Sequence, residues 1–487
     1  MDEDFLQGLT GRVVVPSDPI YPEARQGFNR AVQRYPLIIN YCATAQDVAN
    51  AVRWSRLREV PLRVRGGGHN YAGYSNGDCV LIIDTGELQD IAVDESAGTV
   101  RVGAGVKNRE LYETISSLGY PFPGGTCPTV GVAGYAMGGG WGLTCRTLGL
   151  GCDSLLSLEV IDDNGNLITA SESENEELFW ACRGAGDGNF GAIVSLTFRL
   201  PAKVALVTLV EIEYDDQNEP AQRDFLHAWQ QWLEGADPRM SLIGRVYNDA
   251  EFGLGMLARG IFFGRSQEAE AILQPFLALS PTVVSIQELT FLEAIRIIMS
   301  GYPAYELFTS FSRFVLDWLT DEQIEQAVQT IQQPAPGSVL AGLSLYALGG
   351  QVARTAVDDT AFYYRKAKYI LYLTTDWEDG KWAALNRVWL AQRYPVLGPL
   401  GAGAYVNFPW AGLPCFLRQY YGEHVQRLQV AKRQYDPCNV FTYPQGIEPE
   451  AEPLALPFPC PQTEPDSTPN SEPLHYNHRE FRHLDAP

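Results

Sequence analysis

The feature that most constrains this chain is a glycine-rich segment at residues 124–142, GGTCPTVGVAGYAMGGGWG, in which eight positions are glycine. So many glycines would weaken the interior of a helix or a strand. The apolar side chains of Val130, Met137 and Trp141 argue against a loose surface loop. We therefore expect a backbone that approaches a flat ligand closely, with Cys127 near the start of the segment.

A second glycine run, RGGGHN at residues 65–70, follows a predicted strand at residues 61–65. Successive glycines allow several backbone N–H groups to point at one anion, and a pyrophosphate suits such a nest. Arg65 would offset the charge of that anion or hold the loop. This run matches neither the GxGxxG fingerprint of Rossmann domains nor the P-loop pattern.

The predicted elements change in character near Pro201. Before it, strand patterns at residues 79–84, 100–104 and 191–200 accompany a predicted hairpin with an Asn164-Gly165 turn. After residue 204, strands alternate with helix patterns at residues 222–233, 267–277 and 321–331. This order is typical of an antiparallel sheet with helices on one face, so we predict an α+β fold with two domains.

Composition excludes several classes of protein. The net charge of −22 gives the protein no excess of positive charge that would attract nucleic acid or an anionic membrane. No apolar run approaches the roughly 20 residues of a membrane helix, and the acidic start is unlike a secretory signal. The nine cysteines include no CxxC pair, so we expect no metal site. These features favour a cytoplasmic protein with free thiols. The last 40 residues, 448–487, contain nine of the 31 prolines and are predicted to be an acidic tail.

Further segments accompany the two glycine runs along the chain. They are IIDTGEL at 82–88, LFW at 178–180, RGAG at 183–186, NFG at 189–191, YGE at 421–423, YDP at 435–437 and YPQGI at 443–447. Together they resemble the berberine-bridge-enzyme-like FAD-linked oxidases of the vanillyl-alcohol-oxidase superfamily. The resemblance implies a PCMH-type FAD-binding domain of two α/β subdomains at residues 1–201. It also implies a substrate-binding domain at 202–415, in which helices cover an antiparallel sheet, and a segment at 416–447 that returns to the FAD domain.

In that family the histidine of RGGGH bonds to the flavin C8 methyl group, and the cysteine of GxCPTVG bonds to flavin C6. The resemblance therefore implies FAD held covalently by His69 and Cys127, as in the bicovalent subset of the family. The other expected FAD contacts are Arg65, Gly66, Gly67, Gly68, Asn70, Gly73, Gly124, Thr126, Val130, Gly131, Gly134, Gly138, Gly139, Gly142, Gly191, Ile193, Val194, Tyr443 and Gln445. The resemblance also places Val130 at the family position where valine is associated with access of oxygen to the flavin.

The segment at residues 405–410, which the resemblance implies lies at the substrate side of the site, departs from the family pattern. Members commonly carry Tyr-x-Asn-Tyr-x-Asp, with the second tyrosine as catalytic base, whereas this chain has YVNFPW at residues 405–410. Phe408 thus replaces the usual base, because phenylalanine cannot accept a proton. The remaining candidates are Tyr405 with Asn407, Tyr346, and Tyr364, for which Arg365 would lower the pKa.

The resemblance implies an oxidase that removes a hydride from an alcohol-type carbon of a bulky small molecule and passes the electrons to O2, giving H2O2. The substrate would be an oligosaccharide or a natural product under tailoring, and the protein a monomer or homodimer. Two alternatives stay open. One is a dehydrogenase of the same fold with another acceptor, and the other is a flavin-bearing binding protein that has lost catalysis.

Overall fold

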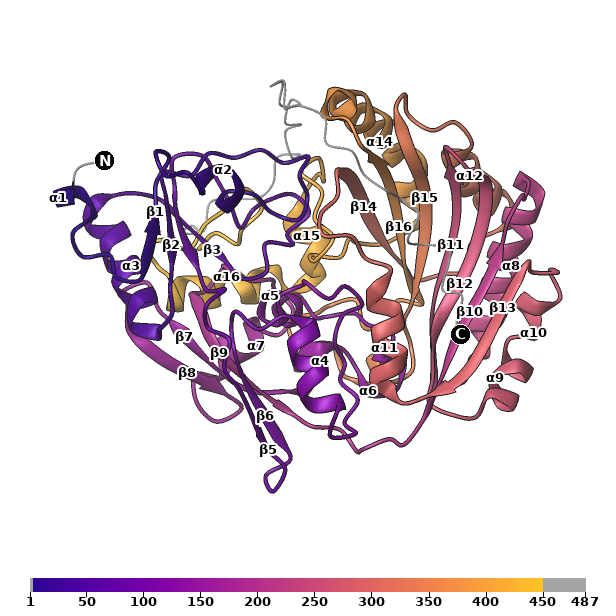
Figure 1. Ribbon diagram of the computed structural model, residues 1–487, viewed down its shortest axis with the longest axis horizontal. Coiled ribbons are helices and arrows are strands. Elements are labelled where there is room, and N and C mark those ends of the chain that lie inside the picture. Colours follow the sequence, from indigo (N-terminus) through magenta and orange to yellow (C-terminus); the bar gives the residue numbers. More distant parts are fainter. Residues whose placement is uncertain (1–2, 450–487) are drawn as a thin grey trace.

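The computed structural model describes residues 3–449, which form three β-sheets, two in the N-terminal half and one in the C-terminal half (Figure 1). The predicted tail at 448–487 lies outside the described residues except for its first two positions.

The first sheet is mixed and has four strands. In spatial order they are β1 (Arg12–Val14), β2 (Ile38–Tyr41), β4 (Leu81–Asp84) and β3 (Leu62–Arg65). Both β2 and β3 pair with β4 in parallel, whereas β1 pairs with β2 antiparallel. Helix α3 (Ala45–Arg58) packs on this sheet and begins with a capping box in which the Thr44 side chain accepts from the Asp47 N–H. Strand β3 ends at Arg65, so the first glycine run leaves the sheet at this edge.

The second sheet is antiparallel and has five strands. In spatial order they are β5 (Ile91–Asp94), β6 (Thr99–Gly103), β9 (Ala192–Arg199), β7 (Leu155–Ile161) and β8 (Leu167–Ser171). The β7–β8 hairpin closes through Asn164 and Gly165, as predicted, and Gly165 has a φ of +78° that favours glycine. The other helices of this half are α1 (Glu3–Leu6), α2 (Tyr21–Ala24), α4 (Asn108–Ser116), α5 (Val132–Met137), α6 (Cys145–Leu148) and α7 (Glu176–Ala181).

The third sheet has seven antiparallel strands. In spatial order they are β13 (Val283–Leu289), β10 (Val207–Tyr214), β12 (Gly253–Phe262), β11 (Met240–Asp249), β15 (Ser338–Ala347), β16 (Tyr369–Trp377) and β14 (Phe308–Val315). The helices α8 (Glu219–Glu234), α12 (Asp321–Gln332) and α14 (Ala383–Leu397) cover one face. The shorter helices are α9 (Ser266–Ile272), α10 (Gln274–Leu277), α11 (Phe291–Ser300) and α13 (Gln351–Arg354). The single helix predicted at 267–277 was wrong, because Pro275 lacks the N–H that would continue α9 and instead starts α10.

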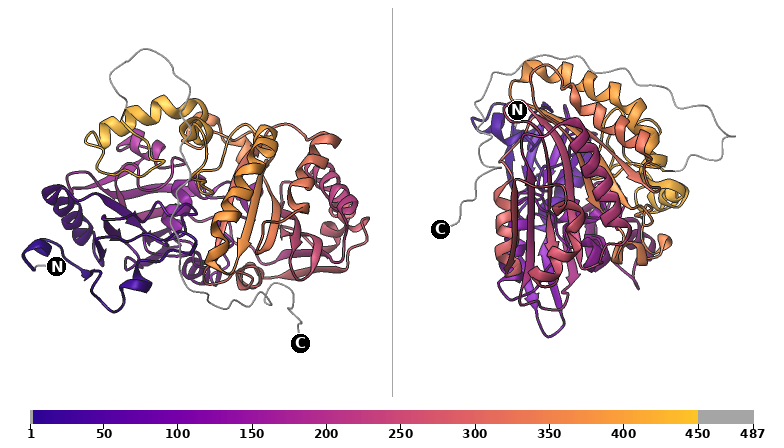
Figure 2. Two further views of the ribbon diagram at one scale, coloured as in Figure 1. Left: turned by 90° about the horizontal axis from the view of Figure 1, so that it is seen from above. Right: turned by 90° about the vertical axis from the view of Figure 1, so that its right-hand side faces the viewer.

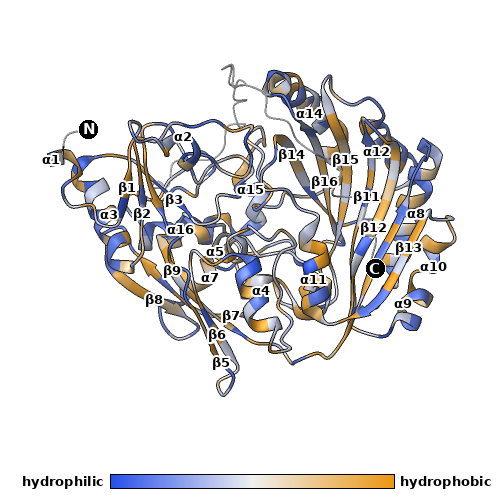
Figure 3. Cartoon of the chain, viewed as in Figure 1, coloured by the Kyte–Doolittle hydropathy of each residue, from blue (hydrophilic) through white to orange (hydrophobic). Residues whose placement is uncertain are grey.

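Alternation along the strands separates the two faces of this sheet. On β15, Leu343 and Leu345 are buried beneath the helices, whereas Ser344 and Tyr346 point to the opposite face. Figure 3 shows hydrophobic residues along the strands of this sheet, together with hydrophilic and hydrophobic residues on the covering helices. The face with Ser344 and Tyr346 is turned toward the N-terminal half of the molecule. The sheets and helices together confirm the predicted α+β fold.

The end of the described chain returns to the N-terminal half. Helices α15 (Phe416–Tyr421) and α16 (Val425–Tyr435) lie over that half in the view from above (Figure 2). The Tyr421 hydroxyl donates to the Ala185 carbonyl at 2.8 Å, and the Lys432 ammonium donates to the Asn189 carbonyl at 2.6 Å. The returning segment therefore holds the loop that precedes β9.

Candidate active site

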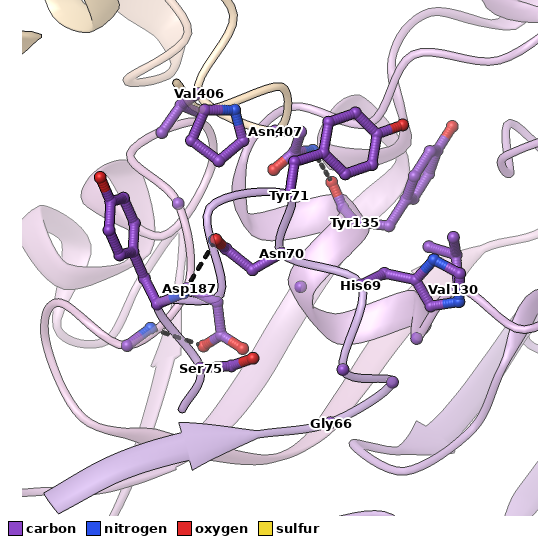
Figure 4. Close-up of a pocket in the computed structure, with 18 of the residues that line it drawn as sticks. Gly66, His69, Asn70, Tyr71, Ser75, Val130, Tyr135, Asp187, Val406 and Asn407 are labelled. Atoms are coloured by element: carbon purple, nitrogen blue, oxygen red, sulfur yellow. Dashed lines mark hydrogen bonds between the residues drawn. The ribbon is translucent and has the colours of Figure 1, made fainter. Parts of the chain in front are cut away.

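A cavity of about 1540 Å³, including its open mouth, lies between the polar face of the seven-stranded sheet and the N-terminal half. Both glycine-rich runs line it, together with side chains from the second half and from the returning segment. Figure 4 shows His69 beside Val130, with Asp187 on another side next to Asn70 and Ser75. Segments far apart in sequence thus form one site.

The two glycine runs meet through their backbones. A Cβ atom on Gly67 would overlap the backbone nitrogen of Gly131 and lie 3.1 Å from the Thr129 carbonyl oxygen. A Cβ atom on Gly131 would lie 2.7 Å from the Gly67 nitrogen. Side chains at these positions would push the runs apart, so glycine is required here by the close approach of two backbones.

His69 and Cys127 both contact the hydroxyl of Thr129. The His69 Nε2 lies 2.8 Å from Thr129 Oγ1, and the Cys127 Sγ lies 3.5 Å from the same atom. The separation between the imidazole nitrogen and the sulfur therefore cannot exceed the sum of these two distances. The structure brings the two predicted attachment residues to one point on the cavity wall.

The imidazole of His69 is held and kept neutral by its surroundings. The Phe28 ring stacks on it with centroids 4.2 Å apart and an angle of 22° between the planes. Burial, with the nearby Lys107 cation, lowers the pKa of His69 to about 3. At neutral pH this side chain is an uncharged imidazole with one free lone pair, which is the form that can act as a nucleophile.

The Tyr405 hydroxyl accepts three hydrogen bonds. The backbone N–H groups of Gly140 and Trp141 donate to it at 3.0 Å each, and the Asn407 amide donates at 3.1 Å. Asn407 is itself fixed because its amide also donates to the Tyr135 carbonyl at 2.9 Å. Burial raises the pKa of Tyr405, while these three donors act in the opposite direction. The hydroxyl of Tyr405 therefore keeps its proton at neutral pH. The three hydrogen bonds to its oxygen all come from N–H donors.

Phe408 lies in a cluster of aromatic rings at the cavity. The Tyr71 ring is parallel to it, with centroids 5.3 Å apart, and Tyr346 and Tyr372 pack at 5.4 Å and 5.1 Å. Burial raises the pKa of Tyr346, and the Arg245 cation acts against this shift. The position at which the family pattern has a tyrosine thus belongs to an aromatic wall.

The structure places the other expected cofactor residues in two groups. Those that line the cavity are Gly66, Gly67, Gly68, Asn70, Thr126, Val130, Gly131, Gly134, Tyr443 and Gln445. Those that are not among its lining residues are Arg65, Gly73, Gly124, Gly138, Gly139, Gly142, Gly191, Ile193 and Val194. Arg65 instead forms a buried ion pair with Asp84 at 2.5 Å and donates to the Ala24 carbonyl at 2.9 Å, so it holds the loop.

Tyr364 is not brought to the cavity. Its ring stacks on Phe314 with centroids 4.5 Å apart, and its hydroxyl donates to the Arg418 carbonyl at 3.2 Å. The expected partner Arg365 is buried in an ion pair with Asp153 at 2.7 Å. The structure therefore leaves Tyr405, Asn407 and Tyr346 at the cavity and assigns Tyr364 to packing.

Three residues at or near the site, Asp187, Glu306 and Tyr302, are not among the candidates predicted from the sequence. Asp187 interrupts the glycines of residues 184–191 and lines the cavity, and burial raises its pKa to about 6. Burial, together with the nearby Asp376 carboxylate, raises the pKa of Glu306 to about 8. The hydroxyl of Tyr302 and that of Thr126 lie 2.6 Å apart and join the two halves at the cavity. The aspartate within a glycine run was a usable signal, whereas the other two residues come from distant segments.

The site suits a long ligand with a flat ring and a phosphate-bearing tail. Glycine backbones at Gly66, Gly67, Gly131 and Gly134 form one wall of the cavity. Uncharged His69 and the Cys127 thiol stand on that wall, and tyrosines face them. These groups fit FAD, with the glycine runs against the cofactor and the aromatic wall left for a substrate.

Within residues 3–449 no group of three or more His, Cys, Asp or Glu side chains could hold a metal ion. None of the helices in this same range is long and apolar enough to cross a membrane.

Known proteins with similar sequences include FAD-linked oxidoreductases, in agreement with a site that fits FAD. The family described as FAD binding domain matches residues 36–171, and the family described as berberine and berberine like matches residues 404–448. The FAD-linked oxidoreductase YgaK of Bacillus subtilis, itself described as uncharacterized, is 36% identical over 456 residues, which cover 91% of this chain and 97% of YgaK. The xylooligosaccharide oxidase of Thermothelomyces thermophilus is 29% identical and covers 87% of this chain and 89% of its own length.

A solved structure shows the same architecture. The structure of BBE-like 1 from Physcomitrella patens superposes with a TM-score of 0.84 at 27% identity, covering 92% of this chain and 99% of its own. The glycine-lined cavity and the returning C-terminal segment correspond to the two matched families. The chain therefore belongs to the berberine-bridge-enzyme-like FAD-linked oxidoreductases.

Proposed function

We propose that this FAD-linked oxidoreductase holds its FAD by two covalent bonds, from His69 and Cys127, and acts as an oxidase. The observation that carries the proposal is the convergence of both side chains on Thr129 Oγ1 within one cavity. A neutral imidazole and a thiol at one point on the wall can reach two positions of a single flat ring.

The proposed substrate is a bulky small molecule with an alcohol-type carbon, either an oligosaccharide or a natural product under tailoring. When bound, FAD supplies the acceptor for a hydride from that carbon. Tyr71, Tyr346 and Phe408 line the cavity, and aromatic faces of this kind suit the apolar faces of sugar or aromatic rings. Similarity to a xylooligosaccharide oxidase supports the oligosaccharide alternative.

Tyr405 and Asn407 are the residues that we propose for handling the substrate oxygen. The Tyr405 oxygen is saturated by three N–H donors, so its own proton is the group left to bond a substrate oxygen in the cavity. A proton can pass between this hydroxyl and the substrate while the donors stabilise negative charge on the phenolic oxygen. This arrangement provides a proton-transfer group although Phe408 stands at the usual position.

Oxygen is the proposed electron acceptor. Val130 lines the cavity beside His69, where a larger side chain would fill the approach to the cofactor (Figure 4). Oxygen consumption with stoichiometric H2O2 during substrate turnover would support the oxidase. Turnover with a dye and negligible oxygen consumption would instead favour the dehydrogenase.

Acid denaturation tests the covalent proposal directly. We expect the yellow colour to stay with the precipitated wild-type polypeptide and with the single variants H69A and C127A. The double variant should release its FAD, because neither bond remains. Release of all FAD from the wild-type protein would refute the proposal.

A further inference from the structure

The hydroxyl of Thr129 lies between the two proposed attachment residues and has no part in the function described so far. We propose that Thr129 is a positioning residue for cofactor attachment: its hydroxyl fixes the imidazole of His69 through Nε2, leaves Nδ1 free to bond the cofactor, and holds the Cys127 thiol beside it. The inference rests on the proposed bicovalent function.

The geometry at His69 supports a single orientation. Stacking on Phe28 restricts the ring, and Nε2 is the ring nitrogen that lies 2.8 Å from Thr129 Oγ1. Within residues 3–449, no protein group forms a hydrogen bond with Nδ1 of His69. A neutral imidazole carries one N–H, so when Nε2–H donates to Thr129 the lone pair is on Nδ1.

The same hydroxyl acts on Cys127. Burial raises the pKa of the Cys127 thiol, and hydrogen bonds from the side chain and backbone of Thr129 act in the opposite direction. The thiolate is the reactive form of cysteine, so these contacts favour the form that bonds to carbon. One threonine therefore contributes to both attachment residues.

Thr129 can act in this way because its backbone is fixed. The N–H groups of Arg109 and Asn108, at the start of α4, donate to the carbonyls of Pro128 at 3.1 Å and Val130 at 2.9 Å. The Asn108 amide also donates to the Cys127 carbonyl at 3.0 Å. With the Gly67 backbone packed against the other side, the hydroxyl is a fixed point and not a mobile surface group.

The chemistry balances with oxygen as oxidant. Attachment of His69 breaks a C–H bond of the flavin methyl group and forms an N–C bond at Nδ1, and the ring then releases its Nε2 proton. Attachment of Cys127 breaks an S–H and a C–H bond and forms an S–C bond. Each attachment removes two protons and two electrons overall, and one O2 accepts them to give one H2O2. The proposed oxidase reaction already uses this oxidant.

The test compares the variants T129V and T129S with the wild-type holoenzyme. Valine keeps the shape but removes the hydroxyl, whereas serine retains it. Incompletely loaded protein is mixed with FAD in air, and acid-stable flavin is followed with time, with the linked residues located by peptide mass spectrometry. T144V is the matched control, because the buried Thr144 hydroxyl donates to the Phe122 carbonyl away from the cavity.

We expect T129V to bind FAD but to attach it about tenfold more slowly or less completely, consistent with loss of one hydrogen bond that orients a reacting group. T129S should restore the rate, and T144V should attach FAD as the wild type does. A purely structural effect of T129V would lower the melting temperature and would not be rescued selectively by serine.

Two outcomes overturn the inference, and they are distinguishable. Attachment by T129V at the wild-type rate and to the same residues would refute the role of Thr129 and leave the bicovalent proposal intact. Release of all FAD from the wild-type protein in acid would refute both.

Discussion

Replacement of Lys432 by methionine should destabilise the protein strongly, because this lysine belongs to an ion pair that is removed from water. The side chains of Lys432 and Asp436 are both 0% exposed. The ammonium donates to the Asp436 carboxylate and to the carbonyls of Asn189 and Phe441, each at 2.6 Å. These bonds tie α16 to the loop before β9 and to the segment that carries Tyr443.

The magnitude follows from what the substitution leaves behind. Methionine has a similar length, so packing is largely preserved, but Asp436 becomes a buried carboxylate whose remaining donors are the N–H groups of Val440 and Phe441 at 2.8 Å each. Removal of one partner of a buried pair costs about 3–5 kcal/mol in unfolding free energy. The variant K203M is the control, because Lys203 and Glu95 are each 51% exposed and such pairs contribute about 0–1 kcal/mol.

Guanidinium-induced unfolding of the holoenzyme, followed by tryptophan fluorescence, measures this difference as a shift in midpoint. The double variant K432M/D436N should be less destabilised than the sum of the single variants, because asparagine carries no charge that needs a partner. If K432M unfolds within about 1 kcal/mol of K203M, the ion pair does not hold the returning segment and the reasoning is refuted.

Four other substitutions test separate parts of the site. Y405F should lower kcat by about 10²–10⁴-fold with flavin content unchanged, because it removes the proposed proton-transfer group; a normal kcat would exclude Tyr405 from the chemistry. Burial raises the pKa of Asp187 to about 6, so the folded chain binds an extra proton and stability falls as pH rises from about 4 to 6. D187N should remove this fall and raise stability at pH 7.5 by at most about 3 kcal/mol, which thermal unfolding between pH 4 and 7.5 measures; identical pH profiles would contradict the prediction. G67A should separate the two glycine runs, reduce acid-stable flavin and cost about 1–3 kcal/mol in stability; wild-type flavin content would show that the runs tolerate the change. V130L should slow reoxidation by O2 in stopped-flow absorbance while dye reduction is retained, and an unchanged rate with O2 would remove Val130 from oxygen access.

Part of the site could be predicted because its chemistry lies in contiguous residues. The motifs at 65–70 and 124–134 place His69 and Cys127 next to glycines, and the close approach of Gly67 to Gly131 explains why these runs occur together. The candidate Tyr364 shows the limit of this reasoning. Its sequence context resembles that of a tyrosine beside a cation, yet the ring stacks in the core and Arg365 pairs with Asp153.

The sequence by itself determined the α+β fold, the FAD-linked class and the two residues proposed to bond the cofactor. The fold, the cofactor class and the attachment residues depend on local backbone requirements and on short motifs of contiguous residues. Only the tertiary structure decided that Thr129 Oγ1 joins His69 to Cys127, that three N–H groups meet on Tyr405, and that Tyr71 and Tyr372 enclose Phe408. These contacts join loops and strands far apart in sequence, and their geometry is set by how the two halves pack and not by the composition of any one segment.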